Sequence, residues 1–325
     1  MGLFVNEILF SNQVIVYLLS ESILFALLLV AFFVSLKIVL KWDFESFSPA
    51  QFKLEQQAYL VTTIILFVFA IKFFLTLYFT FTIDVLSLLV PGAMCSAGVI
   101  TANSYGSPLL VLKLLILFGL TLWLYVNFYD VRTKNYQWFK EKSFLFMGIF
   151  LLIVVELGLD FFYFSNIDTH LPVSCCSALF GQLEGANPLP FGLDIKMLLI
   201  LFYLLFVMVI LTLVSKQSVL YIVSNILFLY VAYFAVVYFF GTYIYELPTH
   251  KCPFCMLQKE YYYVGYLVWS SLLLGSYMGI SSAITSLWLK KEFKSYKMVM
   301  GLLGFFVLIC TGYVVVFYGG NGVFL

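Results

Sequence analysis

The sequence predicts an all-α integral membrane protein, a polytopic bundle of about eight transmembrane helices. Two features of the composition lead to this prediction: 64% of the 325 residues are apolar, and only 10% carry a charge. The third feature is that the apolar residues form long uninterrupted runs. A helix that crosses the hydrocarbon core needs about 20 such residues. Because the runs are continuous rather than alternating, they favour helices over a β-barrel.

Eight stretches of the sequence have the length that a spanning helix needs. They are 13–40, 58–80, 108–129, 143–165, 193–216, 218–242, 262–288 and 298–318. The first is too long for a cleaved signal peptide and no Lys or Arg precedes it, so we expect it to stay in the mature chain. We expect residues 1–325 to form a single polytopic membrane domain, with halves 1–165 and 193–325 joined by the outward loop 166–192.

The basic residues predict how the chain is oriented. Lysine and arginine follow the first, third, fifth and seventh apolar stretches, whereas the opposite connections contain only Lys251 and Lys259. Short basic loops are retained in the cytoplasm. Both termini and the other loops are therefore predicted to face outward, toward the periplasm if the membrane is a bacterial inner membrane. The lipid bilayer is the expected partner, and the sequence contains no nucleotide- or nucleic-acid-binding motif.

Five of the six cysteines fall in the outward connections: Cys95, Cys175, Cys176, Cys252 and Cys255. The first interpretation is a thiol–disulfide redox protein, because two thiols separated by two residues can cycle between dithiol and disulfide. Cys252 is then the attacking thiolate and Cys255 its resolving partner, while the other three cysteines take part in the exchange. A periplasmic thioredoxin-like protein is the expected partner in this case.

The same connections also contain residues that bind soft metals. Thiolate, thioether and imidazole groups select copper(I) or zinc. The candidate ligands are Cys175, Cys176, Cys252, Cys255, His170, His250, Met94 and Met256. The second interpretation is therefore a copper or zinc accessory that delivers metal to an exported metalloprotein. A third is a scaffold subunit whose loops are stapled by disulfides and which catalyses nothing.

Two neighbours of Cys252 bear on its reactivity. His250 and Lys251 precede it directly, and positive charge beside a thiol favours the thiolate. Covalent c-type haem needs a histidine directly after the second cysteine of the pair, but Met256 stands there. The sequence therefore excludes that class of site.

Ionisable residues inside the apolar stretches form a second group of candidates, since such residues are costly in the membrane and usually face a partner or a cavity. They are Glu21, Lys72, Lys113, Glu156, Asp160 and Lys196. Glu156 and Asp160 are four residues apart and so share one helix face. Structural ion pairs are one interpretation. The other is a cavity in the outer half of the bundle, in which an acid carries protons and a lysine binds a quinone or an anion.

A shift of 157 residues suggests an internal repeat. It aligns Pro91 with Pro248, Cys95 with Cys252 and Tyr105 with Tyr262. The same shift aligns the second, third and fourth apolar stretches with the sixth, seventh and eighth. The sequence therefore permits a parallel four-plus-four duplication.

The arrangement of outward cysteine pairs above a helix bundle is similar to that of the quinone-linked membrane thiol oxidases. In those proteins the cysteines pass electrons to a quinone at the outer ends of the helices. This chain has twice as many predicted helices as the four-helix members, and its cysteine spacing does not align with theirs. The similarity therefore implies a mechanism, with a quinone as the expected cofactor, and assigns no residue.

Overall fold

The computed structural model describes residues 7–43, 45–46, 48–133, 136–173, 189, 192–290 and 296–325. Every regular element within these ranges is a helix, and eight of the helices are long and apolar enough to cross a membrane. The predicted polytopic helical membrane protein is confirmed. The chain divides into two compact units: unit 1 is Met1–Leu89 with Ile100–His170, and unit 2 is Val90–Val99 with Leu171–Leu325.

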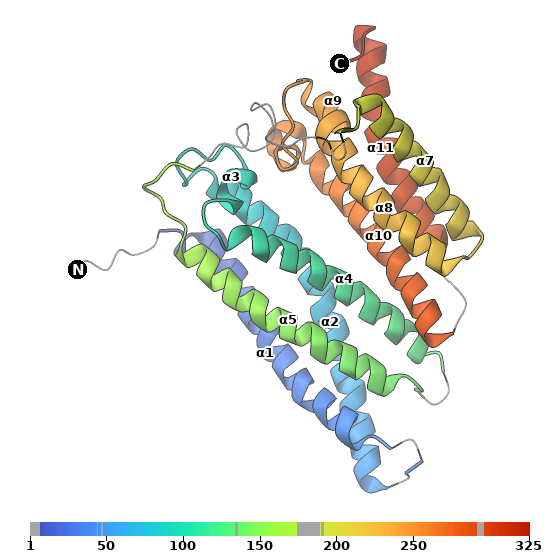
Figure 1. The fold of residues 1–325 in the computed structure, drawn as a ribbon. Helices are drawn as coiled ribbons and strands as arrows, with labels where there is room; N and C mark the ends of the chain where they lie inside the picture. Colours follow the sequence, from blue (N-terminus) through green and yellow to red (C-terminus); the bar gives the residue numbers. More distant parts are fainter. Residues whose placement is uncertain are drawn as a thin grey trace. The chain divides into compact units, whose positions relative to one another are not determined.

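Unit 1 is built from four long helices, α1 (Asn12–Lys41), α2 (Pro49–Leu86), α4 (Gly106–Asp130) and α5 (Phe139–Ser165). Helices α1 and α4 each pack against α2 and α5, so the helices form a closed ring (Figure 1). Helix α2 begins at Pro49, directly after Ser48, whose hydroxyl accepts a hydrogen bond from the Gln51 N–H at 3.2 Å. A serine cap and a proline in the first turn both favour a helix start.

Unit 2 contains the other four long helices, α7 (Ile195–Val214), α8 (Ser218–Ala235), α10 (Val264–Leu289) and α11 (Tyr296–Asn321). Helix α8 continues through the π-helical turn η2 (Val236–Phe240) into α9 (Gly241–Tyr245), and the three together form one candidate span. Helix α10 packs against α8 and α11, and α7 packs against the same two helices. Unit 2 is therefore also a four-helix ring (Figure 1).

The two rings have the same order of neighbours. Under the shift of 157 residues, the pairs α2·α4 and α4·α5 of unit 1 correspond to α8·α10 and α10·α11 of unit 2, and both contacts exist in each ring. Short connections between antiparallel helices produce this order in any up-and-down bundle. The duplication and the single-domain organisation therefore stay predictions.

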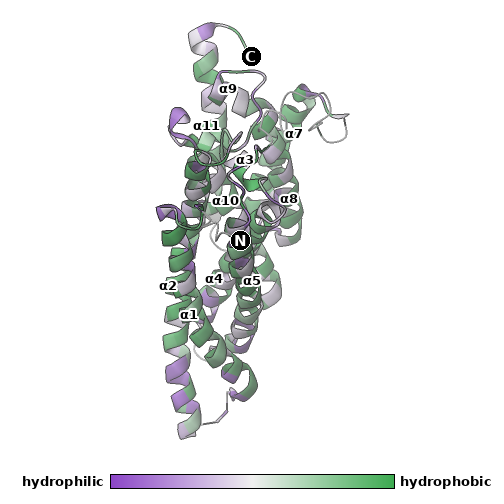
Figure 2. Ribbon diagram, turned by 90° about the vertical axis from the view of Figure 1, so that its left-hand side faces the viewer, coloured by the Kyte–Doolittle hydropathy of each residue, from purple (hydrophilic) through white to green (hydrophobic). Residues whose placement is uncertain are grey.

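The outer surfaces of the helices are apolar. Large hydrophobic side chains such as Leu19, Phe67, Phe74, Leu151 and Val316 are more than half exposed. Figure 2 shows helices that are mainly hydrophobic along their length, with hydrophilic residues at the first turns of α2. So many exposed apolar side chains would aggregate in water. They fit a surface that is covered by lipid.

Candidate functional site

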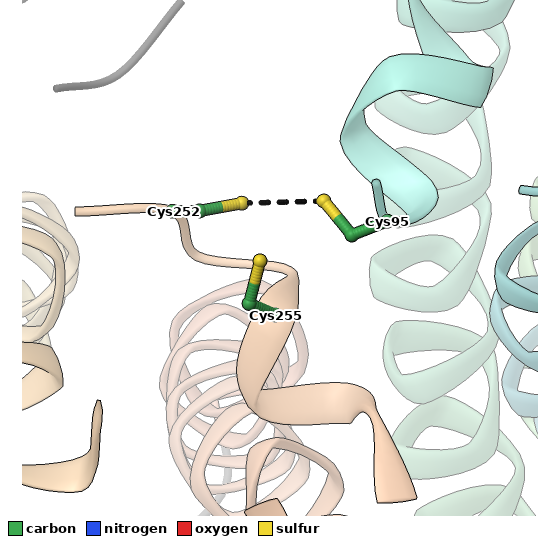
Figure 3. A group of neighbouring side chains, drawn as sticks. All are labelled: Cys95, Cys252 and Cys255. Atoms are coloured by element: carbon green, nitrogen blue, oxygen red, sulfur yellow. Dashed lines mark hydrogen bonds between the residues drawn. The ribbon is translucent and has the colours of Figure 1, made fainter. Parts of the chain in front are cut away.

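Three cysteines of unit 2 meet, although two of them are 157 residues apart in the sequence. The Sγ atoms of Cys95 and Cys252 are 3.6 Å apart. The Sγ atoms of Cys95, Cys252 and Cys255 all lie within 4.8 Å of one another. Figure 3 shows the Cys95 and Cys252 sulfurs pointing at each other, with the Cys255 sulfur directed toward the space between them. We call these three residues the thiol cluster.

The thiol cluster is buried. Cys95, Cys252 and Cys255 are 0%, 2% and 4% exposed. A disulfide bond has a length of about 2.05 Å, so the 3.6 Å separation of Cys95 and Cys252 is a contact between two thiols. The burial limits the access of another protein's thiol to these sulfurs.

The Cys95 segment is held in unit 2 by its backbone. Cys95 directly precedes the short helix α3 (Ser96–Ile100). The Val173 N–H donates a hydrogen bond to the Pro91 carbonyl at 2.9 Å. Gly92 has a φ of +80°, and a Cβ at this position would lie only 2.7 Å from the Val173 carbonyl oxygen. The tight turn before Cys95 therefore requires glycine.

The segment Cys252-Pro253-Phe254-Cys255 is fixed by two aromatic side chains. The Tyr245 hydroxyl, at the end of α9, donates to the Cys252 carbonyl and accepts a hydrogen bond from the Met256 N–H at 3.1 Å. The Trp269 indole N–H, from α10, donates to the Pro253 carbonyl at 3.1 Å. Both ends of the segment are thus anchored to helices.

Two further contacts complete the support of the thiol cluster. The Gln258 side-chain amide donates to the Met94 carbonyl at 3.1 Å, which joins the two cysteine-bearing segments. Met256 is fully buried against Gly265 of α10. A Cβ at Gly265 would lie 2.6 Å from Met256 Cγ, so only glycine allows this approach.

Two basic residues precede Cys252, and His250 does not supply the positive charge that was expected of it. Burial lowers the pKa of His250, which keeps its ring uncharged at neutral pH. The ring packs edge-on against Tyr245 with centroids 4.4 Å apart, and its Nε2 is buried without a hydrogen-bond partner. The Lys251 Nζ lies 5.1 Å from the centre of the Tyr238 ring. His250 therefore supplies no positive charge to the thiolate.

The other predicted ligands have varied positions. Cys175 and Cys176 lie outside the described residues. Met94 is 69% exposed, and His170 is an exposed residue of unit 1 whose N–H donates to the Asp168 carboxylate at 2.7 Å. Within the described ranges, His170 and His250 are not in the thiol cluster.

The intramembrane charges gather in unit 1. The side chains of Glu21, Lys72, Lys113, Glu156 and Asp160 are in direct contact, and none of these residues is more than 4% exposed. We call these five residues the charge cluster. Lys196, at the start of α7 in unit 2, is exposed. Whether the charge cluster serves a quinone stays a prediction.

Each lysine of the charge cluster bridges two acids. The Lys72 Nζ lies 2.7 and 2.6 Å from the two carboxylate oxygens of Glu21 and 2.7 Å from Glu156 Oε2. The contact between Lys72 and Glu156 is an ion pair. The Lys113 Nζ lies 2.8 Å from Glu156 Oε1 and 3.0 Å from both oxygens of Asp160. Glu156 therefore joins the two halves of the charge cluster.

Sequence reasoning missed the uncharged residues that hold both clusters. Tyr17 contacts three members of the charge cluster, and its position four residues before Glu21 places both side chains on one helix face. Tyr245, Trp269 and Gln258 come from helices or turns on either side of the cysteine pair, and no spacing rule links them to it.

Comparison with protein-family models, with curated proteins and with solved structures finds no match to this chain. Three sulfur ligands within 4.8 Å of one another could hold a metal ion or form disulfides in alternative pairs.

Proposed function

We propose that the protein is a membrane protein whose thiol cluster binds a thiophilic metal ion, copper(I) or zinc. The observation that carries this proposal is the mutual approach of three buried sulfur atoms within 4.8 Å. Metal–sulfur bonds of about 2.3 Å place the sulfurs of one ion about 3.8–4.0 Å apart, in tetrahedral or trigonal geometry. The observed 3.6 Å between Cys95 and Cys252 needs only a small adjustment to reach that range.

The chemistry of the ligands selects the metal. Thiolates favour copper(I) and zinc over harder ions such as magnesium. Three thiolates complete a trigonal copper(I) site, whereas zinc would take a fourth ligand. Backbone anchors from Tyr245, Trp269 and Gln258 support the three-sulfur geometry, because they fix the segments that carry it. Supporting hydrogen bonds of this kind raise metal affinity.

The second candidate function is thiol–disulfide redox chemistry, and the 3.6 Å contact of Cys95 with Cys252 favours it. Oxidation would join these two sulfurs and release two protons and two electrons, for which a quinone is a suitable acceptor. The Cys255 thiolate, within 4.8 Å of both, could then attack the Cys252 sulfur, which forms a Cys252–Cys255 disulfide, breaks the Cys95–Cys252 bond and releases Cys95 as a thiolate. Burial of all three thiols favours the metal function over exchange with another protein.

Metal analysis of the purified full-length protein tests the proposal. We expect stoichiometric copper or zinc after expression in medium that contains either metal, and protection of three thiols from maleimide. Cys95→Ser, Cys252→Ser and Cys255→Ser should each weaken metal binding by more than about tenfold. Cys310→Ala is the matched control, because Cys310 is buried in α11 and does not belong to the thiol cluster.

The redox function predicts a different result. The protein would then contain no stoichiometric metal, and mass spectrometry without reductant would find a Cys95–Cys252 or Cys252–Cys255 disulfide. Metal binding that survives all three serine substitutions would place the metal elsewhere and overturn the proposal.

A further inference from the structure

The charge cluster of unit 1 contains one more acid than bases. Three carboxyl groups, from Glu21, Glu156 and Asp160, face two ammonium groups, from Lys72 and Lys113. If every group were ionised, the charge cluster would carry one net negative charge within helices that span the membrane. A buried uncompensated charge is costly, and such a group usually becomes neutral instead. One additional positive charge is therefore needed to make the charge cluster neutral.

Tyr17 shows where a proton would lie. Its hydroxyl oxygen contacts three polar atoms: Lys113 Nζ at 2.5 Å, Glu21 Oε1 at 3.0 Å and Asp160 Oδ2 at 3.0 Å. An ammonium group can only donate, and a tyrosine hydroxyl has a single hydrogen to donate. The hydroxyl can therefore satisfy one carboxylate. The second contact is also satisfied when the other carboxyl group is protonated and donates to the Tyr17 oxygen.

The ion contacts distinguish the two carboxyl groups. Glu21 has both oxygens within 2.7 Å of the Lys72 Nζ. Asp160 has both oxygens 3.0 Å from Lys113. That lysine makes shorter contacts with Glu156, at 2.8 Å, and with Tyr17. The carboxylate of Asp160 is thus the least compensated of the three.

We propose that the charge cluster is a proton-binding site in which Asp160 holds one exchangeable proton, donated to the Tyr17 hydroxyl oxygen. The bound form of the cluster is neutral, and release of the proton to water leaves it with one negative charge. Such a site is suited to proton transfer across part of the membrane. This inference does not depend on the thiol cluster.

The surroundings of Asp160 include a polar or charged side chain from each helix of the ring. They are Tyr17 and Glu21 of α1, Lys72 of α2, Lys113 of α4, and Glu156 and Tyr163 of α5.

Unit 1 also provides an internal reference, the pair of Asp130 and Lys142, whose charged atoms are 2.8 Å apart. This pair is also buried, but acid and base are balanced.

Infrared spectroscopy of the full-length protein in lipid vesicles tests the proposal. At neutral pH we expect the C=O band of a buried carboxylic acid, and a shift of that band after transfer to D₂O. Asp160→Asn removes the excess acid and should abolish the band. Asp130→Asn, the matched control, should keep the band. It should also lower the melting temperature, because it leaves Lys142 unpaired.

Tyr17→Phe provides a second variant that does not change the charge count. The band should remain, at a shifted frequency, because the acid loses the oxygen that accepts its proton. A wild-type protein without the band, a band that does not respond to D₂O, or a band that remains in Asp160→Asn would each overturn the proposal. Loss of the band on addition of sodium or potassium at constant pH would identify a metal cation as the occupant and would also overturn it.

Discussion

The two units form the same four-helix ring but bury different kinds of polar residue. All seven charged residues that are buried within the described ranges belong to unit 1: Glu21, Lys72, Lys113, Asp130, Lys142, Glu156 and Asp160. The buried polar residues of unit 2 are serine, threonine and asparagine, whose hydroxyl and amide groups bond mostly within the helices. The reactive residues of unit 2 are thiols in connecting segments.

This difference predicts how each unit responds to substitution. Each buried lysine of unit 1 contacts at least one carboxyl group, so the removal of a lysine leaves an acid buried without its counter-ion. In unit 2 the thiol cluster depends on backbone hydrogen bonds and close packing around two connecting segments. Substitutions in unit 1 should therefore act first on folding, and those around the thiol cluster first on ligand affinity.

The largest effect is expected for Lys72→Met. Methionine keeps much of the volume but leaves Glu21 and part of Glu156 without a counter-ion. Removal of one partner from a buried ion pair costs about 3–5 kcal/mol, and we expect a destabilisation of that size in thermal unfolding in detergent. Lys196→Met, at an exposed position in unit 2, is the control and should have no effect. Equal melting temperatures for both variants would contradict the difference between the units.

The membrane class and the eight helices could be predicted from the sequence because lipid requires long apolar runs, and those are visible residue by residue. Helix ends were harder to predict. Helix α2 begins at Pro49 rather than near residue 58, because residues such as Lys53, Glu55 and Gln56 form helix well without being apolar. The sixth span extends to Tyr245 through a π turn that no hydropathy pattern reveals.

The two clusters were predictable to different degrees. Intramembrane charges are rare enough that each one stood out, and the need to neutralise them made their mutual contact foreseeable. The sequence suggested that cysteines gather, because their connecting segments are predicted to lie on one side of the membrane. It did not show which cysteines meet. The contact of Cys95 with Cys252 depends on Gly92, Gln258 and Tyr245, which set the paths of two segments distant in sequence.

The next effect in size concerns the packing beneath the thiol cluster. Gly265→Ala places a Cβ 2.6 Å from Met256 Cγ and 2.8 Å from the Met256 carbonyl carbon, so the segment after Cys255 must move. Overpacking of this kind costs about 1–3 kcal/mol. We expect a lower melting temperature together with weaker metal binding. Gly304→Ala in α11, where a Cβ meets nothing within 4 Å, should change neither property. If both variants behave alike, close packing does not position the cysteine pair.

A smaller effect is expected when a hydrogen bond to the cysteine segment is removed without a change in volume. Tyr245→Phe deletes the hydroxyl that bonds the Cys252 carbonyl and the Met256 N–H. Loss of such supporting contacts weakens metal binding about 10–100-fold, and we expect the lower end of that range in a competition titration with a chromogenic chelator. Tyr318→Phe, at a partly exposed position in α11, is the matched control. Unchanged affinity in Tyr245→Phe would mean that Trp269 and Gln258 suffice to hold the segments.

The smallest effect separates the two histidines of the chain by their response to acid. Burial lowers the pKa of His250, so its ring is neutral in the folded protein under conditions in which the unfolded chain, with a pKa of about 6.5, already binds a proton. As the pH falls below about 6.5, the unfolded state takes up the proton first, and the free energy of unfolding decreases until the folded ring is protonated as well. His250→Gln removes this contribution, so the metal-free variant should lose less stability than the wild type over the same acidic range. His170→Gln, at an exposed position of unit 1, should retain the wild-type slope. Parallel acid profiles for the wild type and both variants would show that the half-buried ring of His250 is protonated as easily in the folded protein as in the unfolded chain.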